Sequence, residues 1–64
     1  MNDGKKYIGE KAVSELTGIA CSTLRKFRFY GKEGPAYIKI GRSVRYALED
    51  VYGFMDSRRI QPRQ

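Results

Sequence analysis

Residues 12–28 read AVSELTGIACSTLRKFR and carry the strongest structural pattern in the chain. Apolar residues recur at helical spacing in two short segments, and a turn at residues 17–20, TGIA, separates them. In the second segment, Leu24 and Phe27 lie on one side of the expected helix, and polar and basic residues lie on the other. Two amphipathic helices joined by a tight turn are typical of a helix-turn-helix, which presents its second helix to the major groove of DNA.

The first helix is expected over residues 10–17. Gly9 is suited to the N-cap, and Glu10 places a negative charge in the first turn, where the helix dipole favours it. Gly18 is suited to the left-handed backbone conformation that ends many helices. Ile19 follows in the turn, and we expect it to fill the gap between the two helices.

The second helix is expected over residues 21–30. Its predicted buried stripe contains Leu24 and Phe27, with Ala20 and Gly31 at the two ends. The predicted exposed side consists of Ser22, Arg25, Lys26 and Phe29, with Thr23 at its flank.

Residues 37–46, YIKIGRSVRY, change to an alternation of apolar and basic residues, which predicts the two strands of a hairpin. We expect a three-residue loop at Gly41-Arg42-Ser43. With that loop length, Lys39 faces Arg45 directly across the hairpin. Two like charges in such a pair destabilise a free hairpin, so we expect this face to meet an anion.

A last helix is expected over residues 48–59, where Leu48, Val51, Tyr52 and Met55 recur at helical spacing. The predicted fold class is therefore a small α+β winged helix-turn-helix, with a helix–turn–helix, a two-stranded β-hairpin wing and a C-terminal helix. We expect residues 7–59 to form this domain, between a flexible N-terminus at 1–6 and a flexible tail at 60–64.

The composition limits the classes of function that the chain can serve. Its 64 residues make one small domain, and the net charge of +6 favours either a phosphate backbone as partner or a solvated basic surface. Cys21 is the only cysteine and there is no histidine, so we expect no internal disulfide, metal site, cofactor or enzymatic activity. No apolar run is long enough to span a membrane, and we expect a protein of the reducing cytoplasm.

Four motifs follow one another in a specific order: Leu16-Thr17-Gly18-Ile19, then Ser22-Thr23-Leu24 with Phe27, then the basic stretch GPAYIKIGRSVRY, then Glu49-Asp50-Val51. In this order they resemble the excisionase and AlpA-type proteins of the MerR-like winged-helix superfamily, over residues 7–55. Two positions depart from the family pattern. Ala20 stands where a serine N-cap is common, which predicts a shift of the cap to Cys21 or Ser22, and Phe27 stands where tryptophan is frequent.

The resemblance implies a protein that binds double-stranded DNA, with its second helix in the major groove and its wing in the minor groove. It assigns DNA contacts to Ser22, Thr23, Arg25 and Lys26 in the helix and to Lys39, Arg42, Ser43 and Arg45 in the wing. It also implies an excisionase, a recombination directionality factor of a phage or integrative element in a bacterial cell, with a cognate integrase as partner.

The chemistry of the helix residues leaves several contacts open. Arg25 is suited to the O6 and N7 atoms of guanine, to a phosphate or to solvent. Lys26 is a flexible point charge and is suited to a phosphate. Ser22 and Thr23 stand near a helix N-terminus, where their hydroxyls can meet a phosphate or cap the helix.

In the wing, Arg42 is expected to enter the minor groove, because a narrow groove attracts arginine. Lys39 and Arg45 are then expected to hold the flanking phosphates. Phe29 is expected either to touch a thymine methyl group or to pack under the wing. Four more arginines are expected to be solvated or to attract phosphates in general: Arg28, Arg58, Arg59 and Arg63.

Two further classes of function stay open. One is an AlpA- or MerR-like transcriptional regulator with the same fold, and the other is a protein-interaction module whose second helix docks on a partner chain. Because a single DNA-reading module covers few base pairs, we expect several copies side by side on DNA, or a protein partner.

Overall fold

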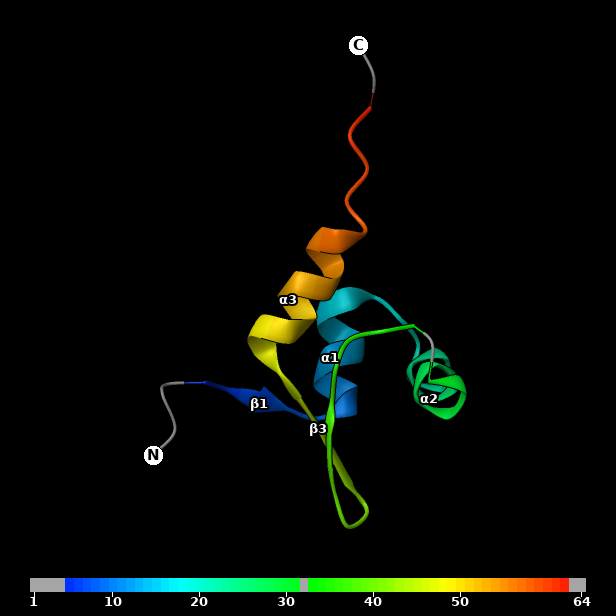
Figure 1. Cartoon of the computed structure of the whole chain (residues 1–64), viewed down its shortest axis with the longest axis vertical. Coiled ribbons are helices and arrows are strands. Elements are labelled where there is room, and N and C mark those ends of the chain that lie inside the picture. The colour runs from blue at the N-terminus through cyan, green and yellow to red at the C-terminus, as the bar shows by residue number, and fades with distance from the viewer. Residues whose placement is uncertain (1–4, 32, 63–64) are drawn as a thin grey trace.

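Three helices and a three-stranded antiparallel sheet make up the computed structural model, which describes residues 5–31 and 33–62 (Figure 1). In chain order the elements are β1 (Tyr7–Ile8), α1 (Glu10–Thr17), α2 (Cys21–Tyr30), β2 (Ile38–Ile40), β3 (Ser43–Ala47) and α3 (Leu48–Ser57). The small α+β class predicted from the sequence is confirmed, and α1 and α2 have the predicted bounds.

The turn between α1 and α2 is held by local hydrogen bonds. Gly18 has a left-handed φ of 80° and its N–H donates to the carbonyl of Ser14 at 2.8 Å, as its place after the helix predicts. The Thr17 hydroxyl donates to the Val13 carbonyl at 2.7 Å and accepts the N–H of Ile19 at 3.1 Å. These bonds direct Ile19 toward the core, where it packs half-buried as expected.

The start of α2 differs from the prediction. Ala20 is the N-cap, and no side chain accepts a hydrogen bond there, so the expected shift of the cap to Cys21 or Ser22 is wrong. The N–H groups of Thr23 and Leu24 both donate to the Ala20 carbonyl at 3.0 Å, which makes Cys21 the first helical residue. The N-terminus of α2 is therefore left without a side-chain cap.

The sheet has a strand that the sequence pattern does not predict. β1 pairs with β3 through Tyr7 opposite Ala47 and Ile8 opposite Tyr46, so β3 is the central strand and the sheet is larger than the predicted two-stranded hairpin. The Lys6 carbonyl extends this pairing by accepting the N–H of Leu48 at 2.8 Å. A strand of two residues is too short to show an alternating pattern, and it forms only because β3 is available to pair with it.

The loop of the β2–β3 hairpin contains two residues, Gly41 and Arg42, and the predicted three-residue loop is wrong. Gly41 has a φ of 60°, and a glycine at the first of two loop positions is the requirement of a type II′ hairpin turn. The shorter loop shifts the register by one residue, so that Lys39 lies opposite Val44 and not opposite Arg45. Lys39 and Arg45 therefore lie on opposite faces of the hairpin.

The core is built from one side chain of each large element. Val13 of α1, Leu24 of α2, Tyr46 of β3 and Val51 of α3 are each at most 1% exposed. Phe27 packs half-buried against this cluster, as its helical spacing predicts. Ala20 and Gly31, which the helical pattern places at the ends of the buried stripe, are exposed, because α2 meets the core only in its middle.

The last helix ends at Ser57, two residues before the predicted end. The Ser57 hydroxyl donates to the Phe54 carbonyl at 2.6 Å, and the N–H groups of Arg58 and Arg59 donate to carbonyls three residues earlier. These shorter bonds tighten the last turn and end the helix. Residues 60–62 have no regular structure, and Arg63, like residues 1–4, lies outside the described residues.

The arrangement of the elements leaves α2 and the hairpin at one side of the molecule. In Figure 1, α2 is seen nearly along its axis while α1 and α3 run across the view, so α2 crosses both at a large angle. The hairpin projects from the body at the end opposite the C-terminal tail. Within residues 5–31 and 33–62, no helix combines the length and the apolar character needed to cross a membrane.

Candidate nucleic-acid interface

One side of α2 is open to solvent and carries the polar residues that the helical pattern places there. Leu24 is fully buried, whereas Ser22, Arg25 and Lys26 are exposed and Thr23 is half-buried at the flank. Phe29 is 82% exposed, so the alternative in which it packs under the hairpin is wrong. An aromatic side chain held out in water beside two cations gives this helix face both apolar and charged contact surface.

An open groove of about 470 Å³ separates α2 from the β2–β3 hairpin, and we call it the α2–hairpin groove. Four cationic side chains line it, two from the helix and two from the hairpin: Arg25, Arg28, Lys39 and Arg42. The other lining residues are Phe29, Tyr37, Gly41 and Val44. None of the lining residues is acidic, although the carboxylate of Glu10 contacts the two arginines of the helix.

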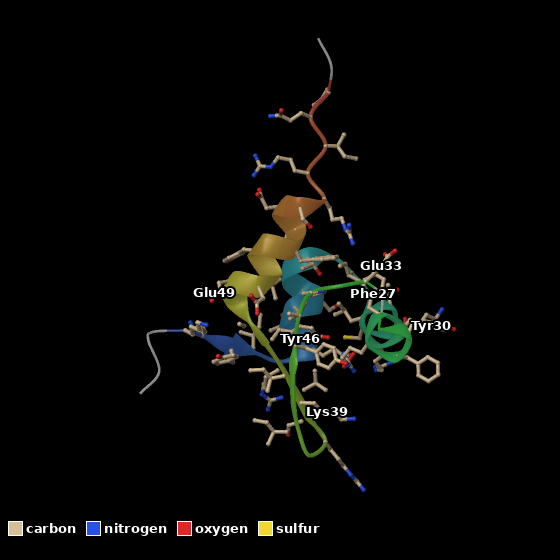
Figure 2. The ribbon with its side chains drawn as sticks, viewed as in Figure 1. Phe27, Tyr30, Glu33, Lys39, Tyr46 and Glu49 are labelled. Atoms are coloured by element: carbon tan, nitrogen blue, oxygen red, sulfur yellow. The ribbon has the colours of Figure 1, made fainter. Side chains whose placement is uncertain are left out.

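The hairpin side of this groove follows from the register of the strands. Lys39 lies opposite Val44, and Tyr37 and Tyr46 have ring centroids 6.2 Å apart, so these four side chains share the face that looks toward α2. Figure 2 shows Lys39 on the projecting hairpin and Tyr46 at its base. Lys39 thus joins Arg42 of the turn at the groove, in a position set by the two-residue loop.

Arg28 is the cation of this groove that is held most firmly. Its Nη1 donates to the Tyr46 hydroxyl at 2.7 Å, its Nη2 lies 3.5 Å from Oε1 of Glu10, and its guanidinium lies 5.9 Å from the centroid of the Tyr37 ring. Partial burial by itself lowers the pKa of Arg28, but the hydrogen bond to Tyr46 and the charge of Glu10 outweigh it and raise the pKa.

The expectation that Arg28 is solvated is therefore wrong, and its general attraction to phosphates stays a prediction. Its side chain is only 17% exposed, and its two terminal nitrogens have partners within the protein. The position is recognisable from the helical pattern, because Arg28 follows Leu24 by four residues and so lies on the buried side of α2.

Arg25 lies at the same groove but is far more accessible. Its Nε lies 3.2 Å from Oε2 of Glu10, and its side chain is 61% exposed. Glu10 thus contacts both Arg25 and Arg28, one with each carboxylate oxygen. The sequence pattern indicates only that the helix dipole favours a negative charge at Glu10, and it does not predict that Glu10 contacts two arginines of α2.

Two of the predicted wing residues lie away from the groove. Ser43 and Arg45 pair with Ile40 and Ile38 on the opposite face of the hairpin. Arg45 Nη1 donates to the Val44 carbonyl at 2.8 Å, which holds the side chain along its own strand. The expectation that Lys39 and Arg45 face one anion together is therefore wrong, because it depended on the three-residue loop.

Thr23 and Lys26 lie at the other flank of α2. They line a second groove of about 390 Å³ together with Phe27, Tyr30 and Glu33. This groove contains one acid and one base, so its charges are balanced. Of the eight predicted residues, the structure brings Arg25, Lys39 and Arg42 together in the α2–hairpin groove, and Ser22, Thr23 and Lys26 extend the exposed surface of the same helix.

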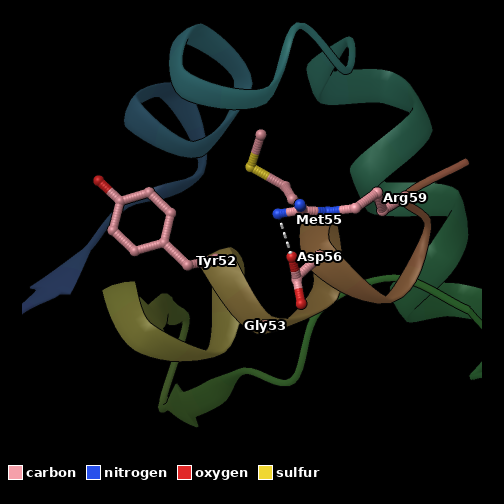
Figure 3. A pocket seen from close by; sticks show the side chains of 5 residues that line it. All are labelled: Tyr52, Gly53, Met55, Asp56 and Arg59. Carbon is pink, nitrogen blue, oxygen red and sulfur yellow. Dashed lines mark hydrogen bonds and ion pairs between the residues drawn. The ribbon is translucent and has the colours of Figure 1, made fainter. Parts of the chain in front are cut away.

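The remaining hollows offer less chemistry. Figure 3 shows a hollow on α3 lined by Tyr52, Gly53, Met55, Asp56 and Arg59, in which Arg59 and Asp56 form an ion pair at 2.6 Å. Within the described part of the chain, no three His, Cys, Asp or Glu side chains gather where they could hold a metal ion. Cys21 is half-buried.

No family model, curated protein or solved structure matches this chain. What the chain binds must therefore be judged from its own residues. The feature that stands out is a groove with cations from a helix and from a projecting hairpin, next to a helix face that carries further polar and basic side chains.

Proposed function

We propose that this chain is a winged helix-turn-helix that binds double-stranded DNA in a sequence-specific manner, with α2 in the major groove and the β2–β3 hairpin as the wing. The observation that carries the proposal is the α2–hairpin groove, where Arg25 of the helix meets Lys39 and Arg42 of the hairpin. Cations on two separate elements around one open groove are suited to a ligand with charge distributed along its length, such as a phosphate backbone.

The geometry of the first two helices supports α2 as the recognition helix. A three-residue connection, Gly18 to Ala20, joins α1 to α2, and α2 crosses α1 at a large angle (Figure 1). Both features are typical of a helix-turn-helix. The exposed face of α2 carries Ser22 and Lys26, which can donate hydrogen bonds to DNA. It also carries Phe29, which offers an apolar surface to a thymine methyl group.

The hairpin supports the same proposal from the other side of the groove. Arg42 lies in the turn at the tip of the hairpin, and an arginine at such a tip is suited to a narrow minor groove. The net charge of +6 adds a general attraction to DNA that weakens as salt rises.

The resemblance of residues 7–55 to excisionase and AlpA-type proteins supports a finer proposal about the biological role. In it, the chain steers a cognate integrase toward excision, with several copies bound side by side on DNA. Regulation of transcription is the alternative, and the two are separable by deleting the gene. Loss of excision with unchanged transcript levels supports the excisionase, and altered transcript levels alone support the regulator.

The DNA proposal is tested by fluorescence anisotropy with a short labelled duplex of random sequence, titrated at several salt concentrations. The wild-type chain is expected to bind at low salt, with an affinity that falls as salt rises. The double variant Arg25→Ala, Arg42→Ala is expected to lose most of this binding while it stays folded at the assay temperature, with a melting temperature lowered by the loss of the Arg25–Glu10 ion pair.

The matched control is Arg59→Ala, which removes a positive charge from the end of α3, far from the groove. It is expected to retain most of the affinity. Absence of binding by the folded wild-type chain at low salt would contradict the proposal and favour the protein-interaction module.

A further inference from the structure

Glu10, the first residue of α1, contacts two arginines of α2 at once. Resting on the proposed function, we infer that Glu10 is a positioning residue, which orients Arg25 so that its guanidinium reads guanine in the major groove. This assigns Arg25 to base recognition and leaves phosphate contacts to the other cations.

The two carboxylate oxygens of Glu10 have separate partners. Oε1 lies 3.5 Å from Nη2 of Arg28, and Oε2 lies 3.2 Å from Nε of Arg25. The Glu10 side chain is 21% exposed, and Oε2 itself is buried with no hydrogen-bond partner of good geometry among the described residues. A buried carboxylate oxygen strongly favours a cation beside it, which keeps Arg25 close.

Arg28 fixes this carboxylate to the body of the protein. It is bound to the hydroxyl of Tyr46, which is 1% exposed and part of the core cluster. Glu10 is therefore attached to the core through Arg28 on one side and through the backbone of α1 on the other. A group held in this way presents a fixed charge to Arg25.

The contact with Glu10 uses the inner edge of the Arg25 guanidinium. Nε lies 3.2 Å from Oε2, and the terminal nitrogens Nη1 and Nη2 make no hydrogen bond among the described residues, on a side chain that is 61% exposed. This pair of nitrogens matches the O6 and N7 acceptors of guanine. A side chain already restrained by an ion pair loses less conformational freedom on binding, which favours a specific contact.

Lys26, the neighbouring cation on the exposed face, differs in this respect. Within residues 5–31 and 33–62 it has no ion-pair partner, and its ammonium group is a point charge on a flexible stem. It is therefore suited to phosphates and not to the paired acceptors of one base.

The test is a selection of bound sequences from a random duplex library, performed in parallel with the wild-type chain, Glu10→Gln and Arg25→Lys. The wild-type chain is expected to select guanine at one position by about tenfold or more over other bases. Both variants are expected to lose most of the preference at that position alone. Glu10→Gln is also expected to bind random duplex at least as tightly as the wild type, because it removes a negative charge from the interface.

Val51→Ala serves as the control for lost stability, since Val51 lies in the core on α3 and lines no part of the groove. It is expected to lower the melting temperature and to leave the selected sequence unchanged. If Glu10→Gln unfolds at the assay temperature, Glu10→Asp takes its place, since it keeps the charge but withdraws it from Arg25 by one methylene.

An unchanged guanine preference in a folded Glu10 variant would overturn the inference while leaving DNA binding intact. A wild-type chain that binds duplex but selects no guanine would do the same. A wild-type chain that binds no duplex at low salt would instead overturn the proposed function itself.

Discussion

Arg28 on α2 and Tyr46 on β3 are joined by a 2.7 Å hydrogen bond, in which the guanidinium donates to the phenol oxygen. The bond links the exposed helix to the strand from which the hairpin extends. Because Tyr46 is 1% exposed, its hydroxyl has no access to bulk water in place of this partner. The bond therefore helps to set the orientation of α2 relative to the hairpin, on which the α2–hairpin groove depends.

Replacing Tyr46 with phenylalanine is expected to lower the free energy of unfolding by about 1.5–3 kcal/mol, the usual range for hydrogen bonds to charged groups. The ring remains to fill the core, so the change in stability reports mainly the hydroxyl. Urea unfolding followed by circular dichroism measures it. Tyr37→Phe is the control, because Tyr37 is 43% exposed and its change is expected to stay within about 0.5 kcal/mol. Equal destabilisation of the two variants would contradict this account.

Gly34 is expected to tolerate no side chain. It has a φ of 97°, and a Cβ at this position would lie 2.6 Å from Cδ2 of Phe27 and 2.8 Å from its Cβ. Gly34→Ala is therefore expected to destabilise the chain by about 1–3 kcal/mol, from backbone strain and displacement of Phe27. Thermal unfolding measures the destabilisation.

Gly53→Ala is the matched control for this substitution. Gly53 lies within α3, and an added Cβ would meet nothing within 4 Å. Alanine is there expected to stabilise the helix by about 0.5–1 kcal/mol, since glycine loses more backbone freedom on folding. A stabilising effect at both positions would contradict the close approach of Phe27 to Gly34.

Lys39→Ala and Arg45→Ala remove the same charge from the two faces of one hairpin. Only Lys39 lines the α2–hairpin groove, so its replacement alone is expected to make log affinity depend less steeply on log salt. The slope is expected to fall by about 0.9, the value for one neutralised phosphate. Duplex titrations at several salt concentrations measure both slopes. An equal change of the slope in Arg45→Ala would contradict this arrangement and favour the three-residue loop, in which Lys39 and Arg45 share one face.

An ion pair between Lys5 and Glu49 connects the chain before β1 to the start of α3, with Nζ of Lys5 3.3 Å from the Glu49 carboxylate. The hydrogen bond and the charge of Glu49 raise the pKa of Lys5 above its ordinary value of 10.5. A raised pKa means that the stabilisation is fully present below pH 10.5 and is lost as the pH rises through the folded-state pKa. NMR titration of the Lys5 side chain measures the shift, which is expected to vanish in Glu49→Gln.

The helices were predictable because their determinants are local. The apolar spacing, Gly9 before α1 and Gly18 after it act within a few residues, and the structure has both helices where these features place them. The end of α3 was not predictable in the same way. Its last turn tightens through backbone bonds, which compete closely with a further helical turn.

The sheet depended on choices that the local pattern does not make. The alternation around Gly41 is compatible with a loop of two or three residues, and one residue of difference sends Arg45 to the far face of the hairpin. β1 has two residues and forms only by pairing with β3, a strand about 40 positions away in the sequence.

Patterns within short segments were enough to specify the small α+β class, the first two helices, their tight turn and the set of cations on the exposed side of α2. Which cations share the α2–hairpin groove was decided by the tertiary structure, because the groove depends on pairing and packing between distant segments. Packing of α1 against α2 brings Glu10 to Arg25 and Arg28, and Tyr46 on β3 then fixes Arg28 in place. These contacts join residues far apart in the chain, so no spacing along the sequence reveals them.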